Sequence, residues 1–462
     1  MSLLIKNGKV VSEKLLQKAD ILIEDDKISK VSKKIKDDLS HEEVIDAEGM
    51  YVFPGFVDPH VHMSLPTPAG YSSDDFYTGS RAALFGGTTT IIDFVTPEHG
   101  QSIPEALNLR KKEAAGSIID YSFHVTPVEF KEKTEQEILK CFDLGVKSLK
   151  VYMAYQDSIG LDDNDLLKVL EIVGKKKHGI VTVHCELDEE IKKLRETFSE
   201  EGKTQPLYHA LSRPAHSESE AVKKLIQMAE KNDCPVYIVH VSTAKSLEHI
   251  EKAQRAGQEV HAETCPHYLL FDNSKYAGLF EDTAPFVVSP PLRKKFDTQE
   301  LWKAVSNNTI KAIGTDHCPF MFSQKEKGRE DFRKIPNGCG SIEHRPGLLY
   351  TYGVRSNKIS VNQFANLLST MPAKIFGLYP AKGVIAAGSD ADLVIWDPAK
   401  EKVISADTHH QNCDINIYEN IKTKGGPEYV LSKGKIAVRN DKIHEKGLKG
   451  SFVFQHKDID ED

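Results

Sequence analysis

FPGFVDPHVH, at residues 53–62, is a short apolar run that ends in two histidines. Seven more apolar runs end in polar residues: GTTTIIDFV (87–95), DYSFHVT (120–126), KSLKVYM (147–153), IVTVHCE (180–186), PVYIVHVS (235–242), QEVHAET (258–264) and IKAIGTDH (310–317). Apolar runs of this length, bounded by polar residues, are typical of buried strands. The chain is therefore expected to contain eight buried strands with polar carboxyl ends.

Helix-like stretches lie between several of these runs. EQEILKCFDLG (135–145), DNDLLKVLEIVGKKKHG (163–179) and SESEAVKKLIQMAEKNDC (217–234) have apolar residues at three-to-four spacing and end near Gly or Asn-Asp. Alternating strands and helices favour a parallel sheet. Eight such units over residues 53–377 predict a TIM-type (β/α)8 barrel, an α/β fold whose active site lies at the carboxyl ends of its strands.

Short strand-like segments flank the barrel on both sides. Before it stand LLIKNGKVV, ADILIEDDKISKVS and EEVIDAEGMYVF, with turns expected at Asn-Gly and Asp-Asp, and after it stand GSDADLVIWDP and YVLSKGKIAVRNDKI. We expect one small β domain built from both termini. The predicted division is residues 1–52 for its N-terminal part, 53–377 for the barrel, 378–445 for its C-terminal part with a subunit-contact segment, and 446–462 for a tail.

Composition narrows the class of protein further. The 462 residues are 40% hydrophobic and 28% charged, as in soluble globular proteins, and no run of about 18 apolar residues could cross a membrane. The N-terminus lacks a signal-peptide pattern, so a cytoplasmic location is expected. A net charge of −8 argues against nucleic acid as a partner and favours a small-molecule substrate. The seven cysteines show no CxxC spacing and are expected to be reduced.

The polar strand ends carry the candidate chemistry. His60 and His62 are two residues apart, so both imidazoles point to the same face and can hold one ion. His184, His240 and Asp316 end further strands and converge on the same barrel mouth. Four histidines and a carboxylate exceed the three protein ligands typical of one catalytic zinc, so two metal ions are inferred. Histidines are also common as plain polar strand ends, which is the alternative interpretation.

Lys150 ends the fourth strand and would face the two metal ions. A protonated amine would be repelled there, whereas a neutral amine that takes up carbon dioxide becomes a carbamate with two oxygens, one for each metal. The alternative is an ordinary surface lysine at a strand end.

Ten segments together resemble the dihydropyrimidinases and hydantoinases: FPGFVDPHVH, GGTTTIIDF, SLKVYMAY, VHCE, VHVS, ETCPHYL, SPPLR, IGTDHCPF, KIPNG and HHQNCDINIYE. The resemblance covers nearly the whole chain. It implies that His60, His62 and Asp316 hold one zinc ion and His184 and His240 the other. It also implies that N6-carboxylated Lys150 and a hydroxide bridge the two ions.

The expected roles agree with general chemistry. Two metal ions lower the pKa of bound water toward ~7 and so supply hydroxide as the nucleophile. Asp316 is placed to take the proton of that water and to return it to the leaving ring nitrogen. Tyr155 resembles the family tyrosine that stabilises the tetrahedral oxyanion, although a loop tyrosine by itself is more often packing.

The resemblance also implies a substrate pocket. Ser289 and Asn337 match positions whose backbone groups bind the imide edge of the ring, and Leu65, Tyr152 and Ile159 match the apolar wall around the exocyclic group. The implied reaction opens 5,6-dihydrouracil, dihydrothymine or hydantoins to N-carbamoyl amino acids, as in pyrimidine catabolism, and a homotetramer is implied as well. One departure is that residues 339–345 read CGSIEHR where the family has a Gly-x-Pro-Gly-Val-Glu-like turn.

The sequence bears on three other functions. A non-catalytic scaffold like the collapsin response mediators is disfavoured, because those relatives lose several ligands that are present here. Dihydroorotase is disfavoured because Met63 and Ser64 follow the histidine pair, where an arginine tends to bind the substrate carboxylate. An allantoinase-like reaction on another cyclic ureide stays open.

Overall fold

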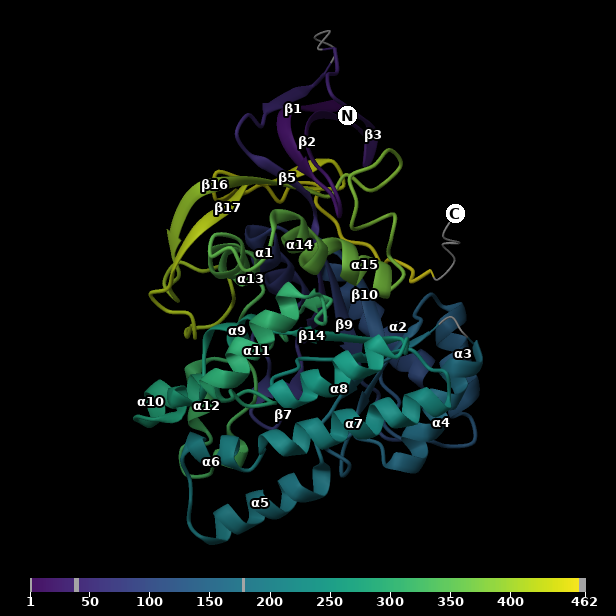
Figure 1. Cartoon of the computed structure of the whole chain (residues 1–462), viewed down its shortest axis with the longest axis vertical. Coiled ribbons are helices and arrows are strands. Elements are labelled where there is room, and N and C mark those ends of the chain that lie inside the picture. Colours follow the sequence, from purple (N-terminus) through teal and green to yellow (C-terminus); the bar gives the residue numbers. More distant parts are fainter. Residues whose placement is uncertain (1, 37–40, 177–178, 457–462) are drawn as a thin grey trace.

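The computed structural model describes residues 2–36, 41–176 and 179–456. A barrel surrounded by helices forms the larger part of the molecule, and a separate sheet made by both ends of the chain lies at one end of it (Figure 1). The predicted architecture is confirmed.

Eight parallel strands form the barrel in chain order. They are β6 (Phe56–Val61), β9 (Thr88–Val95), β10 (Asp120–Val125), β11 (Ser148–Tyr152), β12 (Ile180–His184), β13 (Val236–Ile238), β14 (Val260–Thr264) and β15 (Ala312–Ile313). Each lies within one of the eight predicted runs. An isolated parallel bridge from Val61 to His317 brings the first strand beside the segment that follows the last, so the barrel is nearly closed.

Helices cover the outside of the barrel. Those described are α1 (Phe76–Gly86), α2 (Ile103–Glu113), α3 (Thr134–Asp143), α4 (Asp163–Lys176), α5 (Asp188–Glu200), α6 (Pro206–Leu211), α7 (Ala215–Lys231), α8 (Ala244–Arg255), α9 (Pro266–Leu270), α10 (Phe280–Thr283), α11 (Lys295–Ser306), α12 (Phe322–Glu326), α13 (Arg345–Leu349), α14 (Val361–Ala365) and α15 (Met371–Ile375). The three predicted helices correspond to α3, α4 and α7. In α7, Ala221, Val222, Leu225 and Ala229 are buried, which is the spacing of a helix with one apolar face.

The terminal sheet has the strand order β19-β18-β17-β16-β5-β1-β2-β3, with β4 paired to β1. Its strands are β1 (Ser2–Val11), β2 (Leu16–Glu24), β3 (Lys27–Ser32), β4 (Glu43–Asp46), β5 (Tyr51–Pro54), β16 (Leu393–Val403), β17 (Lys422–Ser432), β18 (Lys435–Arg439) and β19 (Lys442–Ile443). β7 (Pro66–Thr67) and β8 (Gly70–Tyr71) form a separate hairpin. β5 joins the two halves, because it is parallel to β1 and antiparallel to β16. It also crosses the boundary proposed between residues 52 and 53.

One of the two expected turns was wrong. Asp25 and Asp26 do connect β2 to β3, but Asn7-Gly8 lies inside β1, where the register with β2 shifts. Asn7 has a left-handed φ of 63°, and its backbone N–H donates to Asp20 at 2.9 Å. The dipeptide therefore makes a β-bulge. A bulge and a turn both need residues that tolerate a positive φ, so Asn-Gly is suited to either.

Residues 446–456 contact the barrel, although they lie in the segment expected to be a tail. Phe452 forms a bridge with Tyr121 and stacks on Phe123 at a centroid distance of 5.9 Å. The Gln455 side chain accepts from the backbone N–H of Ser148 at 2.9 Å and donates to the Phe123 carbonyl at 2.9 Å. Residues 457–462 lie outside the described part of the chain.

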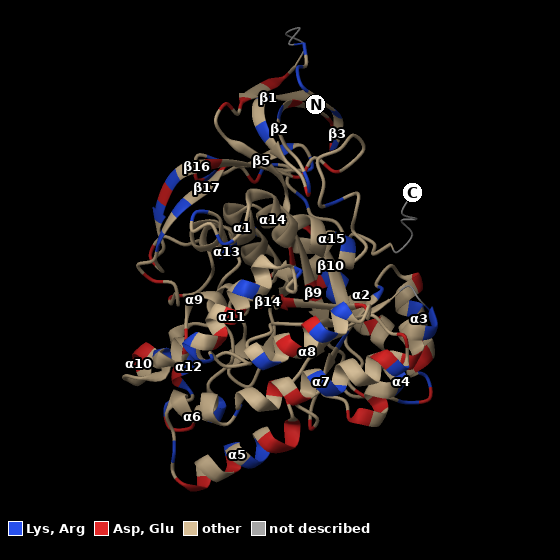
Figure 2. Cartoon of the chain, viewed as in Figure 1, with Lys and Arg blue, Asp and Glu red and all other residues tan. Residues whose placement is uncertain are grey.

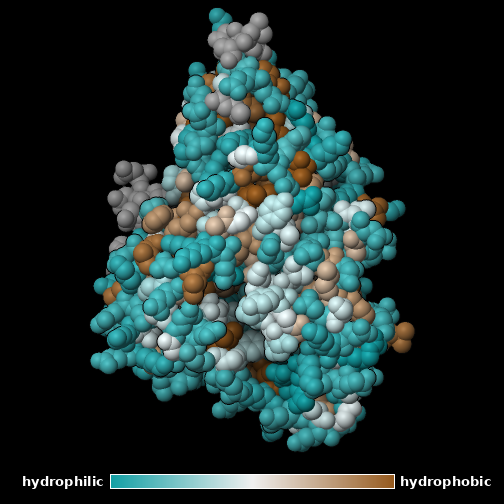
Figure 3. Space-filling view, turned by 180° about the vertical axis from the view of Figure 1, so that it is seen from behind, coloured by the Kyte–Doolittle hydropathy of each residue, from teal (hydrophilic) through white to brown (hydrophobic). Residues whose placement is uncertain are grey.

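The surface is polar. Acidic and basic residues alternate on the outer helices (Figure 2), and the opposite side of the molecule is mostly hydrophilic (Figure 3). No helix among the described residues is long and apolar enough to cross a membrane. All seven cysteines are buried and free, as expected.

Candidate metal centre and active site

His60, His62 and Asp316 meet at the mouth of the barrel. The Asp316 Oδ1 atom lies 3.1 Å from the Nε2 atom of each histidine. One ligand atom from each residue falls within 4.8 Å of the others, which is close enough for one metal ion. His60 lies near the end of β6, His62 follows that strand and Asp316 follows β15, so the near-closure of the barrel brings the three residues together.

His184 and His240 form a second group beside the first. The Nδ1 atom of His184 is 2.9 Å from the Nε2 atom of His240, and both rings are buried. The ring centroids of His60 and His240 are 5.4 Å apart, so the two groups are adjacent. All five predicted strand-end ligands therefore lie in one place.

Lys150 is the buried lysine of β11. Its side chain is 0% exposed, and its Nζ atom has no hydrogen-bond partner within the described residues. The amine lies 4.7 Å from the centroid of the Tyr152 ring and 5.1 Å from that of Phe94, whose ring also contacts His60 and His62. Burial lowers the pKa of Lys150 to about 8. The lowered pKa raises the fraction of neutral amine near neutral pH, and the neutral amine is the form that reacts with carbon dioxide.

The histidines of the site are mostly held neutral. Burial lowers the pKa of His62, His184 and His240 below the usual value, and a neutral imidazole is the form that binds metal. His60 differs, because burial would lower its pKa but Asp316 and Glu263 raise it to about 9. These carboxylates favour a positive charge at this position. Burial would raise the pKa of Asp316, but His60 and His62 hold it well below its usual value.

Three of the predicted site residues have a left-handed backbone. The φ angles are 63° at Tyr155, 40° at His240 and 51° at Asp316. This region costs free energy for residues other than glycine, and such residues gather at functional sites because surrounding contacts hold them there. The backbone at these positions is therefore kept in place by the rest of the fold.

Glu263 is a functional candidate that the sequence analysis missed. It is fully buried in β14, and its Oε1 atom lies 2.5 Å from His60 Nδ1. It also accepts hydrogen bonds from the Tyr237 hydroxyl at 2.8 Å and from the His240 backbone at 3.4 Å. A carboxylate on the far nitrogen of a histidine orients the ring and fixes its tautomer. A glutamate near the carboxyl end of the predicted strand QEVHAET was the available signal.

Arg213 is a second residue that was missed. It is buried, and its Nη2 atom donates to the hydroxyl oxygen of Tyr155 at 2.8 Å. Its Nη1 atom forms an ion pair with Glu186, which in turn contacts His184 Nε2 at 2.8 Å. A buried chain of contacts therefore links Tyr155 to His184. Arg213 stands in a connection before α7, and no local sequence pattern marked it.

The predicted substrate-binding residues differ in burial. Tyr152 is buried, with its ring 5.8 Å from that of His184, whereas Leu65, Ile159, Ser289 and Asn337 are half-buried. The loops that carry Ser289 and Asn337 are joined by a 3.0 Å hydrogen bond from the Gly338 N–H to the Val287 carbonyl.

Residues 339–345, which differ from the family pattern, are hydrogen-bonded to the segment that follows β15. The backbone N–H groups of Ser341 and Ile342 donate to His317 Nδ1 at 3.1 and 3.3 Å. The other ring nitrogen of His317 donates to Asp74 at 2.9 Å. Because His317 follows Asp316 directly, this segment supports the strand end that carries the aspartate.

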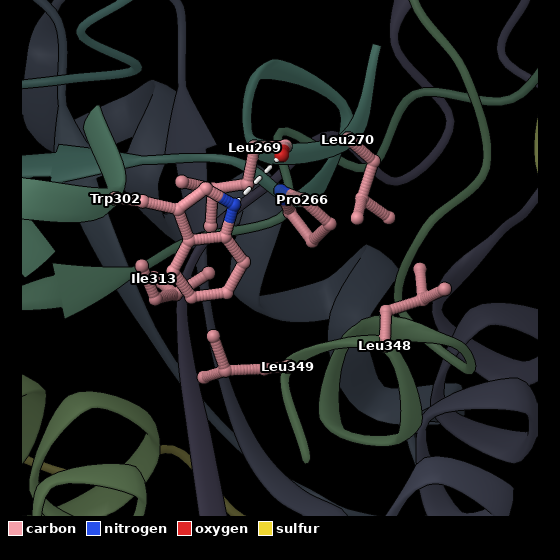
Figure 4. A pocket seen from close by; sticks show the side chains of 7 residues that line it. All are labelled: Pro266, Leu269, Leu270, Trp302, Ile313, Leu348 and Leu349. Atoms are coloured by element: carbon pink, nitrogen blue, oxygen red, sulfur yellow. Dashed lines mark hydrogen bonds between the residues drawn. The ribbon is translucent and has the colours of Figure 1, made fainter. Parts of the chain in front are cut away.

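An apolar cavity lies away from these residues. It is lined by Pro266, Leu269, Leu270, Trp302, Ile313, Leu348 and Leu349, and the Trp302 ring N–H donates to the Leu269 carbonyl at 2.9 Å (Figure 4). Its lining offers only hydrophobic side chains, so it belongs to the packing of helices on the barrel.

Comparison with known proteins agrees with this arrangement. A model of the amidohydrolase family matches residues 51–437. The chain is 43% identical to D-hydantoinase of Geobacillus stearothermophilus, covering 99% of this chain and 97% of that protein. The crystal structure of dihydropyrimidinase from Brevibacillus agri has a TM-score of 0.96 at 40% identity and covers 99% of each chain. L-hydantoinase from Arthrobacter aurescens has a TM-score of 0.88 at 27% identity, covering 98% of this chain and 99% of that one.

The barrel, with its strand-end histidines, and the family match over most of its length define an enzyme of the hydrolase class. The chain belongs to the amidohydrolase family, and within it to the group of the dihydropyrimidinases and hydantoinases.

Proposed function

We propose that this enzyme uses two divalent metal ions, with zinc as the expected metal, to hydrolyse the cyclic amide bond of dihydropyrimidines and hydantoins. The substrates are 5,6-dihydrouracil, dihydrothymine or hydantoins, and the products are N-carbamoyl amino acids. One observation carries the proposal: two adjacent groups of imidazoles share a barrel mouth with a buried lysine amine that has no hydrogen-bond partner among the described residues. The hydantoinases and dihydropyrimidinase among its relatives support the substrate class.

The residues present fit a pair of metal ions. His60, His62 and Asp316 would hold one ion, and His184 and His240 the other, with the carbamate of Lys150 between them. The Lys150 amine has no hydrogen-bond partner among the described residues, and burial lowers its pKa to about 8. Both observations support that modification. When bound, the two ions activate water for attack on the amide carbonyl near neutral pH.

Asp316 would move the proton. Its carboxylate stays ionised, because the neighbouring histidines hold its pKa well below the usual range. An ionised carboxylate at this position can take a proton from the attacking water and then deliver it to the ring nitrogen as the C–N bond breaks.

Tyr155 would stabilise the negative charge that develops on the carbonyl oxygen. Its hydroxyl oxygen accepts the hydrogen bond from Arg213, so the hydroxyl proton is left for the substrate. A positioned donor of this kind stabilises the oxyanion of the tetrahedral intermediate.

The substrate would be a neutral ring. Backbone groups at Ser289 and Asn337 would bind the -CO-NH-CO- edge, while Leu65, Tyr152 and Ile159 would contact the exocyclic group. Met63, which follows the histidine pair, is fully buried and supplies no charge to a ring carboxylate. Dihydroorotate should therefore be a poor substrate, because its carboxylate would lose hydration without a compensating partner.

A kinetic panel tests the substrate. The rate constant kcat/KM is measured for dihydrouracil, hydantoin, 5-substituted hydantoins, allantoin and dihydroorotate, with the ring-opened product identified. We expect dihydrouracil or hydantoins to be preferred. A clear preference for allantoin would establish the alternative function, and a preference for dihydroorotate would contradict the assignment.

Metal analysis tests the centre. We expect two ions per chain and loss of both activity and metal in Lys150→Ala, with partial rescue by a small carboxylic acid that replaces the carbamate. Mass spectrometry of the intact protein should detect the carbamate under native conditions. A Lys150→Ala variant with two ions and a normal rate would refute the role of this lysine. We also propose a cytoplasmic homotetramer, for which light scattering in solution gives the subunit number.

A further inference from the structure

Lys325, in the short helix α12, is a buried cation surrounded by backbone. Its side chain is 0% exposed, and its Nζ atom donates to the carbonyl oxygens of Val287 at 3.1 Å, Pro336 at 2.7 Å and Gly338 at 2.8 Å. An ammonium group has three N–H donors, so each has one acceptor. The contacts replace the water that the group loses on burial.

This arrangement is costly to build. A fully buried lysine is rare unless a carboxylate pairs with it, and here the hydrogen-bond partners that the structure gives to Nζ are all carbonyl oxygens. Burial lowers the pKa of Lys325 to about 8. A methionine or leucine would fill the same volume without that cost, so the charge serves the three carbonyl groups it holds.

Two of those carbonyl groups flank Asn337. The Lys325 ammonium group therefore holds the backbone on both sides of Asn337, at Pro336 and at Gly338. The third carbonyl, of Val287, stands two residues before Ser289. One ammonium group thus anchors both loops that the proposed function assigns to the imide edge of the ring.

We propose that Lys325 is a positioning residue that sets the distance and orientation of the Ser289 and Asn337 backbone groups, and so the binding of the -CO-NH-CO- edge. The inference rests on the proposed function. It predicts an effect on KM that is shared by every ring with this edge, because the exocyclic wall at Leu65, Tyr152 and Ile159 is held by other contacts.

Three variants test the inference. Lys325→Met removes all three hydrogen bonds at similar volume, and Lys325→Gln keeps a neutral N–H donor that reaches fewer carbonyls. Lys334→Met is the matched control, because Lys334 precedes Asn337 by three residues but has an exposed side chain, whose ion pair within the described residues is with Asp331 at 3.9 Å. KM and kcat are measured for hydantoin, 5-phenylhydantoin and dihydrouracil, together with metal content.

We expect KM to rise in the order Lys, Gln, Met. The rise in Lys325→Met should be about tenfold or more, the loss expected when about one hydrogen bond to the ring is misplaced. The rise should be similar for all three rings, kcat and metal content should change less, and Lys334→Met should behave as wild type. An unchanged KM in the folded, metal-loaded Gln variant would overturn the proposal, as would a loss confined to kcat.

Hydrogen–deuterium exchange separates this inference from the proposed function. The peptide that spans residues 335–341 should exchange faster in Lys325→Gln than in wild type, without substrate present. If wild type opens none of the rings but this exchange accelerates, the proposed function fails and the anchoring role stands. If wild type opens the rings and neither exchange nor KM changes, the anchoring role fails. Since Gln retains a donor, the comparison holds even if Lys325→Met does not fold.

Discussion

Asp316 combines three constraints in one side chain. It contacts both His60 and His62, its backbone is left-handed at a φ of 51°, and the following residue, His317, is fixed by Asp74 and by the 339–345 segment. Its carboxylate therefore has little freedom to move. This is the geometry needed by a group that receives a proton and returns it to a different atom.

For Asp316→Asn we expect kcat to fall by about 10²-fold or more, because a positioned acid–base group contributes that much. The amide keeps one oxygen ligand, so metal content should fall less than turnover does. Steady-state kinetics and metal analysis on the same preparation measure both quantities. A normal kcat would show that another residue transfers the proton.

A double-mutant cycle tests whether Arg213 acts through Tyr155. On the proposed mechanism, Tyr155→Phe removes one hydrogen bond to the oxyanion, which should cost about 3 kcal/mol at the transition state. If Arg213 only orients that hydroxyl, Arg213→Gln should lower kcat in wild type and have a much smaller effect in the Tyr155→Phe background. Strictly additive losses would contradict this role.

Arg293 provides the control for that cycle. It lies 3.3 Å from Glu218 and 4.0 Å from Glu186, so it belongs to the same buried cluster of charges, but none of its hydrogen bonds or ion pairs within the described residues reaches Tyr155. Arg293→Gln should therefore couple less strongly with Tyr155→Phe than Arg213→Gln does, because its link to the tyrosine runs through Arg213 and Glu186.

Residues differ in how far the sequence reveals them. The site histidines could be predicted because the carboxyl ends of parallel strands must meet at one end of a barrel, whatever the loops do. Glu263, Arg213 and Lys325 could not be assigned roles in this way. Their contacts join segments that are far apart in the chain, and no local period or motif encodes which carbonyl or ring a buried side chain reaches.

At the scale of elements, Arg345 ties the first barrel strand to the last. It is fully buried, and its Nη1 atom donates to the carbonyls of Val57 in β6 at 3.1 Å and Ile313 in β15 at 2.8 Å. It also lies 3.5 Å from the buried carboxylate of Asp58. β15 is only two residues long, so few backbone hydrogen bonds hold it in the sheet. The contacts of the Arg345 side chain therefore support the closure of the barrel.

Arg345→Met should lower the free energy of unfolding by about 3–5 kcal/mol, because removing one partner leaves a buried charge unpaired. Urea denaturation followed by circular dichroism measures the change. Arg355→Met, at an exposed position nearby in the chain, should change it by no more than about 0.5 kcal/mol. Equal effects of the two substitutions would show that Arg345 does not support closure.

Helices and strands were predicted well where the apolar residues follow a clear period. They were predicted poorly where contacts with distant parts of the chain determine the local structure. The barrel strands and α3, α4 and α7 follow from apolar spacing alone. The bulge at Asn7-Gly8 did not follow, because a turn and a bulge require the same backbone conformation. The contacts of Phe452 and Gln455 did not follow either, because the short apolar run at residues 452–454 carries no sign of which barrel strand it packs against.

The whole molecule depends on how the terminal sheet is joined to the barrel. Part of the junction is aromatic, with Phe53 and Phe56 packed against Trp396 at centroid distances of 6.2 Å each. The other part is ionic. Lys382 is buried and contacts Asp120 of β10 at 2.6 Å, Asp390 at 2.8 Å and Asp392 at 2.5 Å. One ammonium group thus joins a barrel strand to the segment that leads into β16.

Lys382→Met should lower the free energy of unfolding by about 3–5 kcal/mol at pH 7, since the buried carboxylates lose their shared partner. Lys433 is the matched control. It contacts the same Asp120 at 2.6 Å, but its side chain is 26% exposed, so Lys433→Met should cost about 0–1 kcal/mol. Urea denaturation of both variants gives the comparison.

The pH dependence of stability distinguishes the contribution of the Lys382 charge from that of its packing. Without Lys382, the pKa values of the clustered carboxylates should rise in the folded variant above their values in the unfolded chain. The folded variant then binds more protons than its unfolded chain between those values, so its stability falls as pH rises through that range. The deficit of Lys382→Met relative to wild type should therefore be largest near neutral pH and shrink as the pH is lowered toward about 3, where the carboxyl groups of the variant are largely protonated in both the folded and the unfolded state. A deficit that stayed constant from pH 4 to pH 7 would mean that the lysine contributes through packing, and that the barrel and the terminal sheet are joined by their aromatic contacts.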